Sequence, residues 1–306
     1  MKQLREMIQP LIGLAGITVV LLIFAPTFRQ WIAVKDVLEQ STVLLIMATG
    51  TTIMLISGGL DLSVGAILAL VSVITGSLLI TDGVPVWVAL LGGLAAGTFV
   101  GFINGVVITL TGIPTLIATL GMMMAARGVA NMIGAGKDMS RFPDSFSWLG
   151  HGFTGPVIIT ILIVILTWFI LTKLKVGFNA YAIGGNEEVA RLSGIAINRN
   201  KLFFYSFSGF AAALASIVQT SRLDFAHTNR GNGMELWVIA ATVLGGTSMF
   251  GGVGGVWGTV IGVLIIRSLQ AGLIHLHVQS FWQQVAIGVV IIVAVAIDTY
   301  QRREKV

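Results

Sequence analysis

Long apolar runs recur along this chain, and they restrict its fold more than any other feature of the sequence. Only 10% of its 306 residues are charged, whereas a soluble domain carries about 25%. So few charges leave too little polar surface to cover a soluble globule of this size. Because the runs are continuous rather than alternating, they predict membrane-spanning helices and not the strands of a barrel.

The spacing of the runs predicts an all-α polytopic membrane protein with about ten transmembrane helices, some of them broken. Glycine or proline turns separate several runs, and such breaks are typical of substrate pathways in transporters. No linker divides the chain, so residues 1–306 are predicted to form one transmembrane domain. The predicted spans are 8–25, 41–57, 62–80, 85–109, 114–134, 155–172, 201–220, 234–248, 252–274 and 280–298.

The distribution of basic residues predicts which side of the membrane each end occupies. An even number of spans places both termini and the loop at 173–201 on one side. That side receives ten of the eighteen Lys and Arg residues, and positive charge favours the cytoplasmic side. We therefore predict an N-in, C-in topology. The net charge of +5 then reflects contact with cytoplasmic lipid rather than with nucleic acid.

A carboxylate interrupts the second and third apolar runs in the stretch "ISGGLDLSVGAILAL". Asp61 follows the pair Gly58-Gly59 and precedes Ser63. A charge in hydrocarbon costs at least about 2.5–3.5 kcal/mol. We favour a local role for Asp61, as a cap or a partner where two helices break. Contact with substrate and coupling to the movement of another span remain open, and Ser63 is a candidate cap for the next helix.

The glycine spacing of this break recurs later in the chain. Gly58-Gly59 and Gly65 reappear with the same spacing further on, at Gly245-Gly246 and Gly252. This repeat predicts a second helix break and is weak evidence for duplicated halves.

Further polar residues lie within the predicted spans and are candidates for the pathway or for contacts between helices. Asn104 is expected to bond between helices rather than to a hydroxyl group of a substrate. Arg127 is expected to face the bundle and to pair with carbonyls or with a carboxylate, Asp61 or Glu235. Arg267 has the same two options as Arg127, an interface or the bundle, and Glu235 is expected at the membrane interface.

The loop at 173–201 contains a short stretch, "GGNEEVARLSGI", with the features of a capped helix. Asn186 suits the N-cap, Glu187 and Glu188 suit the positive helix end, and Gly194 suits the left-handed end. Both glutamates can pair with Arg191. A helix of about two turns is unstable alone. It is either a solvated turn or a helix that docks on a cytoplasmic partner.

Four collinear blocks together resemble the permease subunits of ribose/xylose-type carbohydrate ABC importers. The blocks are "SGGLDLSVGAILAL", "PTLIATLGMMMAARGVA", "AIGGNEEVARLSGIAINRNKL" and "IAATVLGGTSMFGGVGGVWGT". The resemblance implies an inner-membrane subunit that imports a monosaccharide or related polyol. Its implied partners are a cytoplasmic ABC ATPase, a periplasmic sugar-binding protein, membrane lipid, and a second permease copy or paralogue.

The resemblance also implies that the short helix of the 173–201 loop couples this chain to the ATPase. Matching motif positions are Gly185, Asn186, Ala190, Leu192 and Gly194. ATP and Mg are then bound by the partner, so no cofactor is expected on this chain. "GGTSMFGGVGG" agrees with this expectation because it lacks the Lys-[Ser/Thr] of a phosphate loop.

Two positions depart from the family pattern and leave the particular sugar undefined. Trp237 occupies a position that is commonly acidic, and Arg267 a position that is usually uncharged. An importer of amino acids or nucleosides is one alternative, and an autonomous ion-coupled carrier is another. No catalytic constellation and no metal-ligand set stands out, so the chain is not expected to be an enzyme.

Overall fold

The computed structural model describes residues 2–135 and 139–279, together with 281, 282, 285, 286, 288–290, 292, 293, 296 and 299. The described part is built almost entirely of helices, with one pair of two-residue strands. The elements are α1 (Lys2–Phe24), η1 (Pro26–Arg29), α2 (Trp31–Ile56), α3 (Val64–Leu79), α4 (Val86–Thr111), α5 (Thr115–Gly134), β1 (Met139–Ser140), α6 (Asp144–Ser147), α7 (Thr154–Lys173), α8 (Lys175–Gly185), α9 (Glu187–Leu192), α10 (Ile197–Leu223), β2 (Phe225–Ala226), α11 (Met234–Leu244) and α12 (Val256–His275).

Six of these helices are long and apolar enough to cross a membrane, namely α2, α4, α5, α7, α10 and α12. Three shorter apolar helices accompany them, at Pro10–Phe24, Val64–Leu79 and Met234–Leu244. Together they match nine of the predicted spans. Of the tenth predicted span, 280–298, the structure describes only scattered residues, so the span as a whole lies outside what the structure describes. The chain is an all-α polytopic membrane protein.

Several helix boundaries differ from those predicted. Helix α2 begins at Trp31 rather than at residue 41. The apolar pattern missed its first turns because they contain charged residues, among them the i,i+4 ion pair of Lys35 and Glu39, 3.8 Å apart. Helix α11 ends at Leu244 and α12 begins only at Val256. The predicted spans extended from both sides into the intervening glycine-rich segment, which is a loop in the structure. Helix α8 was not predicted at all.

Helices α2 and α10 form the centre of the bundle. Helix α10 packs against α2, α3 and α4. Its closest approach is to α4, where Gly97 and Gly101 face Gly209. A Cβ atom at Gly101 would lie 2.2 Å from the carbonyl oxygen of Tyr205. Small residues thus let the two helix backbones meet, as is common in membrane proteins.

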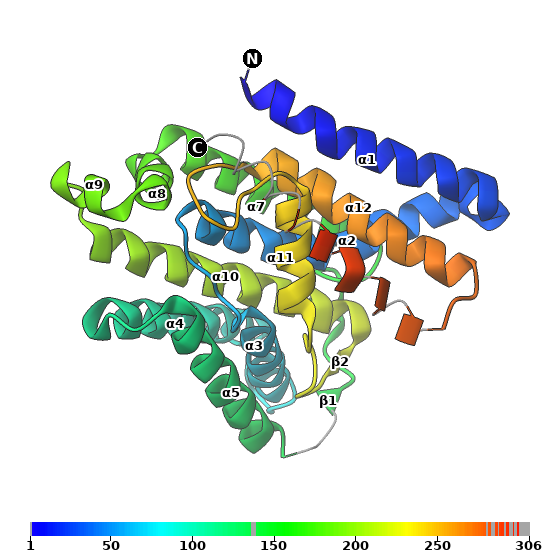
Figure 1. Ribbon diagram of the computed structural model, residues 1–306. Coiled ribbons are helices and arrows are strands. Elements are labelled where there is room, and N and C mark those ends of the chain that lie inside the picture. Colours follow the sequence, from blue (N-terminus) through cyan, green and yellow to red (C-terminus); the bar gives the residue numbers. More distant parts are fainter. Residues whose placement is uncertain are drawn as a thin grey trace.

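Two structural features mark opposite ends of the molecule. Helices α8 and α9 lie at one end, and the antiparallel β1–β2 pair lies at the other (Figure 1). Helix α10 connects these ends because α9 precedes it and β2 follows it directly. Its 27 residues span about 40 Å, which exceeds the thickness of the hydrocarbon core of a bilayer.

Candidate functional site

The short helix α9 has the local structure that the sequence predicts. The side chain of Asn186 accepts a hydrogen bond of 3.0 Å from the backbone N–H of Val189. Gly194 adopts a left-handed conformation with φ of +82°. Behind it, the N–H of Ile195 donates to the carbonyl of Ala190 over 3.1 Å. Both ends of the helix are therefore closed by specific residues.

One ion pair lies within α9 and a second joins α9 to the first turns of α10. Glu187 pairs with Arg191 at 3.2 Å, as predicted, and also with Lys201 at 2.8 Å. Glu188, the other predicted partner of Arg191, forms no ion pair within the described part of the chain. The pair with Lys201 joins α9 to α10 and was not predicted, since the two residues are fourteen positions apart.

The outer surface of α9 is apolar at two positions. Ala190 is buried, whereas Val189 is 58% and Leu192 is 83% exposed. Gly185, the last residue of α8, has open space around the position of a Cβ atom. The segment from Gly185 to Gly194 therefore presents two exposed apolar side chains beside charged ones.

Asp61 lies in the break between α2 and α3 and is almost completely buried. One carboxylate oxygen accepts hydrogen bonds from the N–H (3.0 Å) and the hydroxyl of Ser63. The other accepts a bond of 2.8 Å from the hydroxyl of Ser208 in α10. Asn104 in α4 donates to Ser63 over 2.9 Å. The carboxylate thus joins the break to α10 directly and to α4 through Ser63.

This geometry favours a local role among the options that the sequence left open for Asp61. Both oxygens of Asp61 are engaged within the protein, as the local role requires. Asn104 bonds between helices, as predicted. Ser63 does not cap α3, because its hydroxyl bonds to Asp61 instead. Tyr205 and Ser208 complete the surroundings of the break and were missed, because a tyrosine and a serine in an apolar helix carry no distinctive signal.

The two predicted glycine breaks share one helix-ending motif but differ afterwards. Gly58 and Gly246 both have positive φ, of +74° and +87°. Gly58 therefore corresponds to Gly246, one residue away from the match in the sequence, which paired it with Gly245. The N–H of Gly59 closes the end of α2 and that of Thr247 closes the end of α11.

The third glycine of each set has its own role. Gly65 lies in the first turn of α3, whereas Gly252 lies in the loop after α11 with φ of +77°. The N–H of Gly252 donates to the carbonyl of Ile56 over 2.8 Å. The two breaks therefore meet in space. The repeated spacing is not accompanied by repeated roles.

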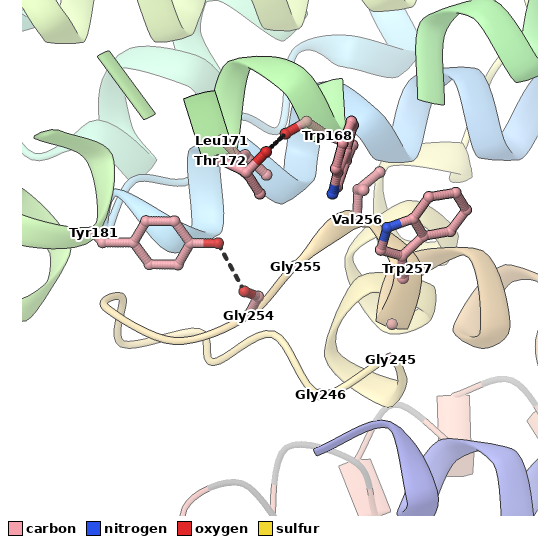
Figure 2. A pocket seen from close by; sticks show the side chains of 11 residues that line it. Trp168, Leu171, Thr172, Tyr181, Gly245, Gly246, Gly254, Gly255, Val256 and Trp257 are labelled. Atoms are coloured by element: carbon pink, nitrogen blue, oxygen red, sulfur yellow. Dashed lines mark hydrogen bonds between the residues drawn. The ribbon is translucent and has the colours of Figure 1, made fainter. Parts of the chain in front are cut away.

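A pocket lies beside this meeting point, between α7, α8 and the loop before α12 (Figure 2). The hydroxyl of Tyr181 in α8 donates to the carbonyl of Gly254 over 2.9 Å. The indoles of Trp168 and Trp257 form part of its wall. A Cβ atom at Gly184 would lie 1.9 Å from the carbonyl oxygen of Ile56. Helix α8 is thus joined closely to the end of α2 and to the loop.

Arg127 and Glu235 lie close to one another in the structure. Nη1 of Arg127 donates to the carbonyls of Thr228, over 2.9 Å, and Arg230, over 2.8 Å. Of the predicted partners, the structure selects carbonyls, and Asp61 bonds elsewhere. Glu235 is only 9% exposed. Glu235 therefore packs inside the protein, and its position at the membrane interface stays a prediction.

The two residues that depart from the resemblance, Trp237 and Arg267, contact each other. The guanidinium of Arg267 in α12 lies 5.8 Å from the centre of the Trp237 ring in α11. It also donates to the side chain of Gln270 over 2.7 Å. Of the two options for Arg267, the structure selects the bundle. A cation over an indole ring stabilises this contact between helices.

No group of three His, Cys, Asp or Glu side chains gathers as a metal site within the described residues. His275, which the sequence places near His277, packs edge-on against Phe28 with ring centres 6.0 Å apart.

Comparison with known proteins supplies the relatives of this chain. Residues 33–295 match the family model described as "Branched-chain amino acid transport system / permease component". The ribose import permease protein RbsC of Escherichia coli (strain K12) is 38% identical over 296 residues, which cover 94% of this chain and 92% of that protein. The RbsC protein of Bacillus subtilis (strain 168) is 39% identical over 295 residues, covering 94% and 91%.

A third relative is the D-allose transport system permease protein AlsC of Escherichia coli (strain K12). It is 37% identical over 271 residues, which cover 87% of this chain and 82% of the relative. No solved structure matches the chain.

Proposed function

This chain belongs to the permease family described as "Branched-chain amino acid transport system / permease component", and from that premise we propose that it is the membrane subunit of an ATP-driven monosaccharide importer. It is a multi-pass protein of the bacterial inner membrane. The near full-length similarity to permeases named for ribose and D-allose is the observation that carries the proposal.

The choice of a sugar over an amino acid rests on the individual relatives. The family description mentions branched-chain amino acids. The relatives that cover most of this chain are named for sugars instead. Amino acid or nucleoside import is therefore the less supported alternative. An autonomous ion-coupled carrier is supported by none of these names and leaves the exposed surface of α9 without a role.

The proposed topology has ten spans with both termini in the cytoplasm. Helices α8 and α9 then lie on the cytoplasmic side, and the β1–β2 pair lies on the periplasmic side. Support comes from the excess of Lys and Arg in the loop at 173–201 and at both termini. The length of α10, which separates these ends, is suited to this arrangement.

The proposed partners follow from the two ends of the molecule. A cytoplasmic ABC ATPase, which binds ATP and Mg, would dock on the segment from Gly185 to Gly194. A periplasmic sugar-binding protein would deliver the substrate at the opposite end. A second permease copy or paralogue would complete the membrane core. ATP hydrolysis would take place on the ATPase, so this chain would have no catalytic residue of its own.

The test is uptake into proteoliposomes that contain this chain, its ATPase and its binding protein. We expect uptake of D-ribose or D-allose that requires both ATP and the ATPase. Replacing Leu192 with Asp should abolish both uptake and recovery of the ATPase in a pull-down, because a buried charge would oppose docking. Replacing Arg199, which lies outside the docking segment, with Gln is the matched control. Sugar uptake without any ATPase or ATP would refute the proposal.

A further inference from the structure

Glu235 has an unusual environment for a buried carboxylate. It is 9% exposed, and its Oε2 atom is buried without a hydrogen-bond partner among the described residues. A carboxylate can accept about four hydrogen bonds, and an unsatisfied buried acceptor is costly. Native structures contain few such groups, and each calls for an explanation.

The position of Glu235 is fixed from several sides. A Cβ atom at Gly65 would lie 2.1 Å from Oε2, so the carboxylate packs directly against the first turn of α3. The same Cβ would lie 2.4 Å from the carbonyl oxygen of Gly231. The backbone N–H of Gly233 lies within reach of the carboxylate. Only a glycine at position 65 permits this close approach.

Two sources of positive potential accompany the carboxylate. The first turn of α3 has amide groups without partners in its own helix, and a helix start favours negative charge. The Arg127 guanidinium in α5 interacts electrostatically with Glu235. Through Nη1, Arg127 also holds the carbonyls of Thr228 and Arg230, which lie in the loop leading to α11. These two sources oppose the cost that burial imposes on a negative charge, and Oε2 keeps unused acceptor capacity among the described residues.

Several residues near Glu235 and Arg127 in the chain are exposed. Leu236, the residue after Glu235, is 50% exposed. Met124, which precedes Arg127 by about one turn of α5, is 70% exposed. Asn232, in the loop before α11, is also exposed. Oε2 itself is buried, so it would meet a molecule outside the bundle only if α11 or α5 moved.

Carboxylates suit polyhydroxylated substrates because each oxygen accepts hydrogen bonds from hydroxyl groups. We propose that Glu235, held between α3, α5 and α11, accepts a hydrogen bond from a hydroxyl group of the transported sugar as it passes through the permease. The inference rests on the proposed function. One charged acceptor is enough to favour a hydroxyl group at one position, yet it leaves the sugar free to depart. Arg127 acts as a positioning residue that holds the loop before α11.

The experiment compares Glu235→Gln with the wild-type chain in the complete importer. ATP-dependent uptake is measured for D-ribose and for its monodeoxy analogues, or for the corresponding D-allose set where the wild type prefers D-allose. The same binding protein serves both permeases, so its own preference cancels from the ratio of variant to wild type. Initial rates are normalised to the amount of permease in the vesicles.

We expect Glu235→Gln to lower uptake of the parent sugar at least fivefold to tenfold, because a neutral acceptor bonds more weakly than a charged one. For the one deoxy analogue that lacks the hydroxyl bonded by Glu235, the variant should take up the analogue no more than about twofold more slowly than the wild type does. Asp61→Asn is the matched control. Both oxygens of Asp61 are bonded within the protein, so this change should lower uptake of the parent sugar and of every analogue by the same factor.

Two results would overturn the inference about Glu235. One is an equal loss for the parent sugar and all analogues, which indicates a structural role. The other is unchanged uptake of every sugar. Where Glu235→Gln is not recovered in the membrane, Glu235→Asp is judged by the same ratios, since it keeps the charge and withdraws the carboxylate by one methylene. Failure of the wild-type importer to take up any sugar with ATP refutes the proposed function instead.

Discussion

Two buried carboxylates of this permease, Asp61 in the break between α2 and α3 and Glu235 in the first turn of α11, have different surroundings. Both oxygens of Asp61 accept hydrogen bonds, from Ser63 and from Ser208. Glu235 keeps one buried oxygen without a partner among the described residues. A carboxylate with both oxygens bonded joins helices, whereas one with an unbonded oxygen retains capacity for a ligand. The difference separates a structural charge from a candidate substrate contact, although both look alike in the sequence.

The largest effect is expected from Asp61→Ala. This change leaves the donors of Ser63 and Ser208 buried without their acceptor, and each unsatisfied buried group costs about 1–3 kcal/mol. Thermal unfolding of the purified permease in detergent should show a clear loss of stability, or the protein should fail to accumulate. Unfolding at the wild-type temperature would show that Asp61 does not hold the break together.

A smaller loss is expected from Gly65→Ala. The added Cβ would meet both the Glu235 carboxylate and the backbone of Gly231, and overpacking costs about 1–3 kcal/mol. The carboxylate must move, so sugar uptake should fall together with thermal stability. Gly121→Ala is the matched control, because a Cβ at that helical position has open space around it. Equal behaviour of the two variants would contradict the close approach of Glu235 to α3.

Ser208→Ala tests only the hydrogen bond that joins Asp61, in the break, to α10. It removes one donor to Asp61, and a hydrogen bond between membrane helices is worth about 0.6–1.7 kcal/mol. The unfolding temperature should fall less than for Asp61→Ala. Ser208→Thr keeps the hydroxyl and should retain most of the stability. A double variant, Ser208→Ala with Asp61→Ala, should lose less than the sum of the single losses, and additivity would argue against coupling.

Asn186→Ala should have a local effect of about 1 kcal/mol at the start of α9, since the N-cap bond to Val189 is lost. Global unfolding of the permease should change little, because α9 is short and mostly exposed. Affinity for the ATPase, measured by surface binding, should decrease. Asn186→Asp restores the cap and should restore the affinity. Equal affinities of Asn186→Ala and wild type would show that the N-cap of α9 does not contribute to docking of the ATPase.

The smallest change in stability is expected from Glu235→Gln. Its Oε2 atom forms no hydrogen bond with the residues that the structure describes, and a glutamine side chain has the same shape. The free energy of unfolding should change by less than about 1 kcal/mol, while sugar uptake falls. A loss of stability as large as that of Asp61→Ala would erase the contrast between the two carboxylates.

Local features of the chain determined much of this structure. Apolar runs located nine helices, since each run must bury or face hydrocarbon for its own length. The cap of α9 depends on residues within a few positions, so Asn186 and Gly194 could be recognised directly. The resemblance carried by four blocks identified the family before any contact was known.

Contacts between distant residues were decided only by the tertiary structure. Asp61 and Ser208 are 147 positions apart, and their hydroxyl–carboxylate bond has no local signature. The burial of Glu235 against the first turn of α3 is likewise decided by packing, because Gly65 and Glu235 lie far apart in the chain. Trp237 and Arg267 stood out separately, and only the packing of α11 on α12 placed one over the other. The sequence determines which segments enter the membrane because hydrophobicity is local. Helix packing determines which polar groups are satisfied, and therefore which remain available for a substrate.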